Sequence, residues 1–407
     1  MILWYYELMK FLSVVLTTIS IIALLCVNCS FSTLEAKTVK TKNFSISQLD
    51  KSIDYAAVYI KTNLSKDGRF VYERDACSDI IYDGKRYNVL RHAGTLYAMS
   101  LYETYTNDEE MHAKRILASE YLLKNYVKKL SNGTYAVVSK KEEEKLPYNT
   151  AKLGGTGLAL IGISDLYKEG KVSEEILTGL GEFIIYMQKK DGSFYSKYNY
   201  DSSQKDDEFI SLYYPGEAAL GLLYLNDVIP DKKWVNSAKK TLLFLADYHK
   251  NKGKNVAFDH WAMLATSKLI KTENNGLTSA EKDILLSFAH QMAEIALNGQ
   301  ITDNKNPYRG AREGNVRPCS IATYMEGEVA IFKIIDDDKL KTQLLRSIML
   351  GVDFLASTQI TTKGETFGGI PRSANYELDT AKNASVIRID NVQHTISAWI
   401  TYRMLFK

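Results

Sequence analysis

Carboxylate side chains stand in stretches of this sequence that are otherwise apolar and have a helical period. Charged groups in such helices are buried or line a cavity, and both placements cost free energy unless the groups are paired or used. Asp259, Glu326 and Asp390 are the predicted catalytic residues. Glycoside hydrolysis uses two such carboxyl groups on opposite sides of a cleft, one as a protonated general acid and the other as a base or nucleophile.

A second set of polar and aromatic side chains accompanies these carboxylates. Aromatic faces stack on sugar rings, and guanidinium groups bind acidic substituents such as a uronate carboxylate. The predicted substrate-binding residues are Arg91, His92, Tyr213, Tyr214, Glu217, His260, Trp261, Arg317, Arg372, Arg388 and His394. Some have a structural alternative. His92 and His394 are equally compatible with hydrogen-bonded core histidines, and Arg317 and Arg388 with ion pairs that hold helices together.

The carboxylates have structural alternatives as well. Asp259 and Asp390 precede predicted helices, where an acidic side chain caps free backbone N–H groups and contributes about 1 kcal/mol. Glu217 follows Pro215 and fits the first turn of a helix, where a negative charge favours the helix dipole. Glu326 lies inside a predicted helix and has neither explanation, which favours a functional role.

The apolar stretches belong to a repeated unit. Turns that contain glycine recur about 60 residues apart, and a fixed period of this size is the signature of stacked supersecondary units. An amphipathic helix precedes each turn, and a helix rich in Gly, Ala, Ser and Thr follows it. Small residues let helices approach closely, so the second helix of each pair is expected inside and the amphipathic helix outside. Segments 68–75 and 133–140, which follow two of the turns, predict short β-ribbons.

Six such pairs predict an all-α fold, an (α/α)6 toroid of about twelve helices in an inner and an outer layer. The polar residues lie at or near the starts of the predicted inner helices. Because equivalent ends of the helices converge on one face of a closed toroid, side chains from distant segments are expected to share a single cavity.

The repeat resembles those of a known group of toroids, and its cleanest copy is Gly181–Phe194, GEFIIYMQKKDGSF. That group includes six-hairpin glycosidases, uronate-processing epimerases and lyases, and terpenoid cyclases. The polar segments YYPGE, DHW and RIDNVQH resemble its carbohydrate-active members, nearest to glycosidases and to the C-terminal domain of glucuronyl C5-epimerases. The resemblance implies the fold, but no catalytic motif matches residue by residue. A terpenoid cyclase is less well supported, because the DxDD acid of squalene-type cyclases is missing.

Three functions remain open. The leading hypothesis is an exported carbohydrate-active enzyme, a glycoside hydrolase of an envelope or extracellular polysaccharide. The second is a uronate epimerase or polysaccharide lyase, in which a base removes the C5 proton and Arg or His stabilises the enolate. The third is a non-catalytic glycan-binding or assembly protein. A histidine or tyrosine opposite the arginine cluster, in place of a second carboxylate, would favour the second over the first.

Composition and motifs exclude several other classes. The chain has 51 Lys and Arg against 48 Asp and Glu, a net charge of +3, which predicts no nucleic-acid partner. It contains none of the glycine-rich or histidine motifs that bind nucleotide phosphates, dinucleotides or catalytic zinc. Its six histidines lack close metal-ligand spacing, so no metal or other cofactor is expected.

The N-terminus has the pattern of an export segment. Lys10 precedes the uncharged run Phe11–Asn28, and a cleavage context ends at Ala36. Residues 1–36 are therefore predicted as a signal peptide or an N-terminal membrane anchor, and residues 43–407 as the toroid domain. The protein is expected to be periplasmic or extracellular, attached to the membrane if the segment is retained. Cys77 and Cys319 could pair there, although separate core thiols are the favoured interpretation.

Overall fold

The computed structural model describes residues 45–82, 86–253 and 256–407. All of them belong to one compact unit, Thr41–Lys407. The predicted export segment, residues 1–36, lies outside the described residues. Within the described ranges, no helix combines the length and apolarity needed to cross a membrane.

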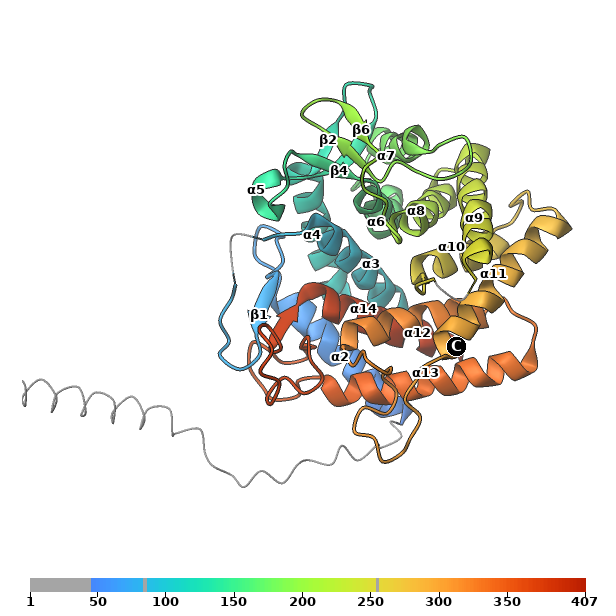
Figure 1. Cartoon of the computed structure of the whole chain (residues 1–407). Helices are drawn as coiled ribbons and strands as arrows, with labels where there is room; N and C mark the ends of the chain where they lie inside the picture. The colour runs from blue at the N-terminus through green and yellow to red at the C-terminus, as the bar shows by residue number, and fades with distance from the viewer. Residues whose placement is uncertain (1–44, 83–85, 254–255) are drawn as a thin grey trace, which may run out of the picture. The chain divides into compact units, whose positions relative to one another are not determined.

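Six helices form a closed inner ring (Figure 1). They are α3 (Val89–Thr106), α6 (Leu153–Ile163), α8 (Tyr214–Val228), α10 (His260–Lys271), α12 (Pro318–Phe332) and α14 (Ile389–Arg403). Each contacts the next in chain order, and α14 contacts α3. Burial in this layer is greatest in α6, where every residue is buried. The predicted (α/α)6 toroid, with the second helix of each pair inside, is confirmed.

Six further helices, of 14 to 21 residues each, form the outer layer. They are α2 (Ile46–Thr62), α4 (Glu109–Asn125), α7 (Glu174–Met187), α9 (Lys232–Lys252), α11 (Ser279–Leu297) and α13 (Asp338–Thr358). Each packs one apolar face on the inner ring; α7, for example, buries Leu177, Leu180 and Ile184 and exposes Glu174 and Glu175. This is the amphipathic pattern that the sequence shows.

Glycines bring inner helices into backbone contact. A Cβ atom on Gly221 of α8 would lie 2.6 Å from the carbonyl oxygen of Gly157 in α6, and a Cβ on Gly157 would lie 2.4 Å from the carbonyl oxygen of Glu217. Any larger side chain would push these helices apart. The small residues of the inner series therefore set the width of the ring.

Short strands form two small sheets in addition to the helices of the toroid. One antiparallel sheet has the order β2-β3-β4-β5-β6, and a second pairs β1 with β7. The strands are β1 (Glu73–Asp75), β2 (Val127–Lys129), β3 (Tyr135–Ser139), β4 (Thr150–Lys152), β5 (Lys197–Asn199), β6 (Gln204–Asp206) and β7 (Val386–Arg388), and the small helical turns α5 (Lys141–Glu144) and η1 (Ser164–Glu169) complete the described elements. Strands β1 and β3 fall in the two predicted ribbons. The pairing of Arg74 with Ile387 joins the first repeat to the last.

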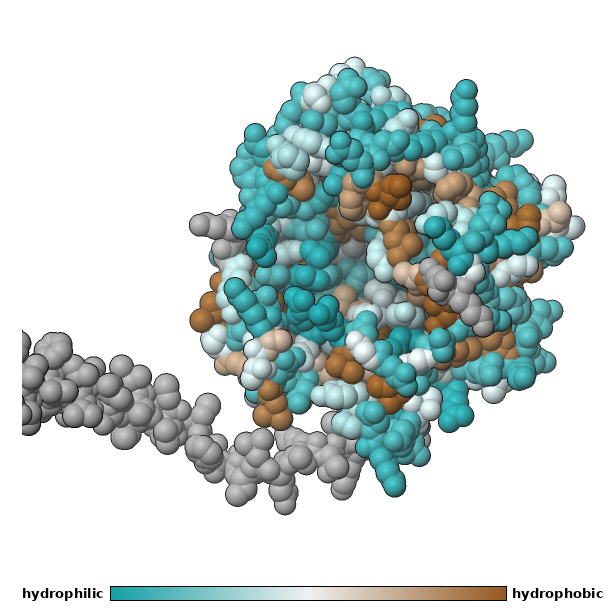
Figure 2. Space-filling view, in the orientation of Figure 1, coloured by the Kyte–Doolittle hydropathy of each residue, from teal (hydrophilic) through white to brown (hydrophobic). Residues whose placement is uncertain are grey.

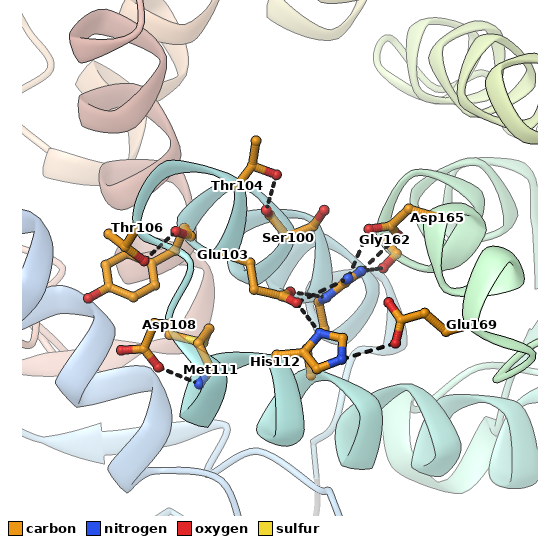
Figure 3. Close-up of polar contacts among 12 residues, drawn as sticks. Ser100, Glu103, Thr104, Thr106, Asp108, Met111, His112, Gly162, Asp165 and Glu169 are labelled. Carbon is orange, nitrogen blue, oxygen red and sulfur yellow. Dashed lines mark hydrogen bonds and ion pairs between the residues drawn. The ribbon is translucent and has the colours of Figure 1, made fainter. Parts of the chain in front are cut away.

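An ionic network centred on the buried Arg115 fixes α3 to its neighbours near the C-terminal end of that helix (Figure 3). Arg115 of α4, only 2% exposed, donates to Asp165 of η1 at 2.8 Å and also pairs with Glu103 of α3. His112 bridges Glu103 and Glu169, with its Nε2 3.0 Å from the latter. Because α3 carries Arg91 in its first turn, this network helps to hold the opposite end of the helix in place.

Candidate active site

The inner ring encloses a cavity of about 540 Å³. Figure 2 shows a hollow near the centre of the face in view, with hydrophilic side chains along its left and lower edges and hydrophobic ones above it and to its right. Every inner helix contributes to the lining, mostly from its first turns. The structure brings ten of the fourteen predicted site residues around this cavity. They are Arg91, Tyr213, Glu217, His260, Trp261, Arg317, Arg372, Arg388, Asp390 and His394.

Local signals place the helix starts at the cavity. Asn88 caps α3, with its side chain accepting a hydrogen bond from the backbone N–H of Leu90 at 3.0 Å. Asp259 caps α10 in the same way through Ala262, also at 3.0 Å. Pro318 opens α12, a position where proline loses no helical hydrogen bond. These caps determine where the helices begin, so the polar residues next to them lie at the end of the ring where the cavity is.

The other four predicted residues lie behind the cavity wall or away from it. Asp259 is fully buried as the cap of α10, and Glu326 is 1% exposed. Tyr214 is half-buried outside the lining. His92 is a core histidine, since its ring contacts the hydroxyl of Tyr87 at 2.6 Å and the carbonyl oxygen of Ala118 at 2.8 Å. Burial lowers the pKa of His92 to about 4.

Two histidines of the cavity share one buried carboxylate. The Nδ1 atom of His394 is hydrogen-bonded to Oε2 of Glu326 at 2.8 Å, and Nε2 of His260 lies 3.7 Å from the same oxygen. The two imidazole centroids are 5.5 Å apart. Ser397 donates a hydrogen bond to the other oxygen of Glu326, which fixes the carboxylate. Among the described residues, none hydrogen-bonds either nitrogen of His260 or Nε2 of His394.

The two imidazoles favour different protonation states. Burial alone would lower the pKa of His394, but the adjacent Glu326 carboxylate outweighs it, so that pKa is raised. Burial and the positive charge of His394 both hold the pKa of His260 well below its usual range. These opposite shifts make His394 the better proton donor of the pair and His260 the imidazole that more readily stays neutral and accepts a proton.

Asp390 is held by two guanidinium groups. Arg91 donates from Nε to Oδ2 at 2.8 Å, and Arg388 donates to Oδ1 at 2.6 Å and to Oδ2 at 2.9 Å. Burial would raise the pKa of Asp390, but the charges of Arg91 and Arg388 hold it well below its usual range. Asp390 is therefore an ionised carboxylate with both oxygens engaged.

Glu217 provides a carboxyl group of the opposite kind. It lines the cavity but is only 5% exposed, and its Oε2 has no hydrogen-bond partner among the described residues. A Cβ on Gly154 would lie 1.8 Å from this oxygen, so glycine is needed to make room for it. Burial, followed by the charge of Asp259, raises the pKa of Glu217 to about 8. Burial raises the pKa of Asp259 to about 7.

Aromatic rings frame the histidine pair. The ring centroid of Trp261 lies 4.9 Å from that of His260 and 6.0 Å from that of His394. Tyr213, which is 40% exposed, lies 5.4 Å from His260. An amphipathic ring such as a sugar can pack on the exposed ring of Tyr213 while its hydroxyl and carbonyl groups meet the polar wall, whereas Trp261, only 3% exposed, supports the histidines from within the wall.

The same cluster has the composition of a metal site. The ligand atoms of His260, Glu326 and His394 lie within 4.8 Å of one another. Two imidazoles and one carboxylate suit zinc or iron, but metal binding requires both imidazoles to be deprotonated at the ligating nitrogen. The same three groups can therefore hold either a proton, shared between His394 and Glu326, or a metal ion.

Several cavity residues were missed in the sequence. Asn391 and Gln393 flank Asp390 and His394 on α14, and Ser320 and Thr323 line the cavity from α12. The signal for Asn391 and Gln393 was present, because both are polar residues in a helix that is buried nearly all round. Ser320 and Thr323 carried no such signal. Cys319 also lines the cavity, and no disulfide joins it to Cys77.

Comparisons with known proteins identify the fold. No protein-family model matches the chain, and no curated protein matches it. Solved structures do match. A D-mannose isomerase has a TM-score of 0.61 at 15% identity, covering 89% of this chain and 98% of its own.

Two other matches have different activities. The cellobiose 2-epimerase from Spirochaeta thermophila DSM 6192 has a TM-score of 0.63 at 11% identity, covering 92% of this chain and 100% of its own. An inactive variant of an α-1,6-mannanase of Salegentibacter sp. HEL1_6, in complex with α-1,6-mannotriose, has a TM-score of 0.60 at 13% identity, covering 88% and 99%. At these identities the likeness shows that the chain shares the (α/α)6 toroid fold of these proteins.

Proposed function

We propose that this protein is a carbohydrate-active isomerase or epimerase that moves a proton at the carbon next to a sugar carbonyl group. The observation that carries this proposal is the pair of cavity histidines that shares the carboxylate of Glu326, with His394 at 2.8 Å and His260 at 3.7 Å from the same oxygen. The pKa of His394 is raised and that of His260 is lowered, so the two imidazoles suit the roles of acid and base. General acid–base catalysis by such a pair needs one group of each kind in reach of the same substrate.

The reaction balances without an added reagent. His260 accepts the proton from the carbon next to the carbonyl group, and the C–H electron pair forms the double bond of an enediol. The carbonyl oxygen takes a proton from Nε2 of His394. Return of a proton to the former carbonyl carbon, while the hydroxyl of the neighbouring carbon gives its proton back to Nε2 of His394, gives the aldose–ketose isomer. Return of a proton to the original carbon on its other face, while the former carbonyl oxygen gives its proton back to His394, gives the epimer.

Glu326 and Ser397 act as positioning residues in this scheme. The carboxylate accepts the Nδ1 proton of His394, which fixes the tautomer and stabilises the imidazolium form. Ser397 in turn holds the carboxylate in place. Nε2 of His260 faces Glu326 and carries the proton of the neutral ring. The lone pair of Nδ1 is then free to accept a proton from the substrate.

The proteins of similar structure support an isomerase or epimerase among the activities that this fold hosts. Two of them are named as a sugar isomerase and a sugar epimerase, and they share the toroid in which the present histidine pair lies. The third, the mannanase variant, is inactive with two consecutive aspartates replaced by asparagine. In this chain, consecutive aspartates among the described residues occur at 206–207 and 336–338, and neither group lines the cavity.

A glycoside hydrolase remains the second candidate, because Glu217 offers a neutral carboxylic acid to the cavity. Hydrolysis also needs a second carboxylate as base or nucleophile, and no residue of the cavity fits that role well. Asp390 lines the cavity, but both of its oxygens are bound to guanidinium groups, which lowers its capacity to act as a base or nucleophile. Asp259 and Glu326 lie outside the lining. The cavity therefore lacks a clear second carboxylate for hydrolysis, whereas both histidines of the proposed acid–base pair line it.

Sugar conversion tests the proposal. The purified protein is incubated with glucose, mannose, fructose, cellobiose and glucuronate, and the products are separated by chromatography. We expect an isomer or epimer of at least one sugar, and a rate that falls about 10²- to 10⁴-fold in His260→Gln and in His394→Gln. His290→Gln, on the outer helix α11, is the matched control and should retain the rate.

Incubation with polysaccharides separates the two candidates. New reducing ends, together with no conversion of any free sugar, would overturn the isomerase proposal in favour of hydrolysis. Conversion that survives in both cavity variants would assign the chemistry to other residues.

We also propose that the protein acts outside the cytoplasm, because the uncharged run Phe11–Asn28 follows Lys10 as in an export signal. Cell fractionation with N-terminal sequencing tests this. A full-length chain recovered only from the cytosol would contradict it.

A further inference from the structure

The cavity holds more guanidinium groups than its carboxylates can pair with. Four arginines line it, and two of them, Arg91 and Arg388, share the single carboxylate of Asp390. The guanidinium groups of the remaining two, Arg317 and Arg372, form no ion pair and no hydrogen bond with any described residue. Because Glu217 favours its neutral form, the cavity has an excess of positive charge.

The two remaining arginines stand where this cavity meets a second one. The second cavity has a volume of about 570 Å³ and shares Arg317 and Arg372 with the first. It also contains Lys382 and one carboxylate, Asp379. Asp379 accepts a hydrogen bond from the backbone N–H of Ala381 at 2.9 Å, so part of its acceptor capacity is used within its own loop.

The backbone at both arginines is anchored. The N–H of Arg317 donates to Asn315 at 3.2 Å, at the start of α12, and the N–H of Arg372 donates to the carbonyl oxygen of Val386 at 2.9 Å, beside β7. Arg317 is exposed and Arg372 is half-buried. The two guanidinium groups therefore reach the junction from fixed points on different segments.

We propose that the substrate of this site carries an anionic group, bound by Arg317 and Arg372, while its sugar carbonyl reaches the histidine pair. Guanidinium groups bind carboxylate and phosphate oxygens through paired, charge-assisted hydrogen bonds. The shared chemistry is an anionic oxygen group on a sugar, either the carboxylate of a uronic acid or a phosphate ester. This inference rests on the proposed function for the position of the carbonyl group, but the anion site itself does not.

Binding measurements test the inference without turnover. Calorimetry on the His260→Gln variant compares three probes of similar size, namely glucuronate, glucose 6-phosphate and neutral glucose. We expect at least one anionic probe to bind about 10- to 100-fold more tightly than glucose, as charge-assisted hydrogen bonds allow. Adding Arg317→Gln or Arg372→Gln should remove most of that preference, and added salt should weaken it.

Lys171→Gln is the matched control, because Lys171 is exposed and lies after the C-terminal end of α6, away from the helix starts that form the cavity. It should leave all three affinities unchanged. A stronger preference for glucuronate identifies a carboxylate, and a stronger preference for glucose 6-phosphate identifies a phosphate. Equal affinity for the three probes, or a preference that survives both arginine variants, overturns the inference.

Its failure is distinguishable from failure of the proposed function. Conversion of neutral sugars by the wild type, with no preference for anionic probes, would leave the isomerase proposal standing and remove the anion site. Arginine-dependent binding of an anionic probe, with no conversion of any sugar, would leave the anion site and remove the isomerase.

Discussion

Replacing Glu217 with glutamine should stabilise the protein near neutral pH. In the folded chain the pKa of this carboxyl group is raised from 4.5 to about 8, because the group is buried beside Gly154 and faces the charge of Asp259. In the unfolded chain the group has its ordinary pKa. Between the two values the folded state therefore binds more protons than the unfolded state, and stability falls as pH rises.

The size of the effect follows from the two pKa values. Between pH 5 and pH 7 the carboxyl group would remove about 2.5 kcal/mol from the free energy of unfolding of the wild type. Glutamine has nearly the same shape and no proton to lose, so Glu217→Gln should not show this loss. The variant should become more stable relative to the wild type as pH rises, by about 2.5 kcal/mol over this range.

Urea unfolding followed by circular dichroism at pH 5, 6 and 7 measures the difference. Glu120→Gln, at an exposed position of α4, is the matched control and should track the wild type. A wild-type-to-variant difference that is flat with pH, or that grows in the opposite direction, would refute the reasoning. It would mean that Glu217 is already ionised in the folded protein at pH 7.

Three further predictions concern the site and the ring. Glu326→Gln removes the charge that raises the pKa of His394, so the alkaline limb of the kcat/KM profile should move to lower pH; an unmoved limb would show that His394 is not the acid. Asp259→Ala should lower the free energy of unfolding by about 1 kcal/mol, because the cap of α10 is lost. A variant with unchanged stability but no sugar conversion would instead show that Asp259 is a catalytic residue. Gly221→Ala places a methyl group 2.6 Å from the carbonyl oxygen of Gly157 and should lower stability by about 1–3 kcal/mol in thermal unfolding, whereas an unchanged Tm would contradict the close packing of α6 on α8.

The repeat made the toroid predictable. Its period fixed the number of helix pairs, and the contrast between small-residue and amphipathic helices separated the layers. Because all inner helices enter the ring from the same side, Arg91, Glu217 and His394 could be assigned to one region from their place in the repeat. The short sheet was less predictable, since strands of three residues such as β4 and β5 are too brief for an alternating pattern to be recognised.

Which side chains face the cavity could not be predicted as well. Successive residues of a helix point about 100° apart, so Arg91 lines the cavity while His92 points into the core. An amphipathic helix reveals its orientation through its apolar stripe, but an inner helix such as α6 is buried on every side and has none. The link from Glu326 to His394 joins residues that are 68 positions apart and depends on the packing of α12 against α14.

The central claim is that the His260–His394 pair transfers a proton at the carbon next to a sugar carbonyl. Incorporation of deuterium from D₂O at that carbon is its most direct test. The wild-type protein is incubated in D₂O with the sugars above, and proton NMR follows the signal of that carbon. The proton-transfer mechanism predicts that the C–H signal is lost at the rate of conversion or faster, and that it is not lost above background in His260→Gln. Conversion of a sugar or cleavage of a glycan by the wild type with every carbon-bound proton retained would contradict it.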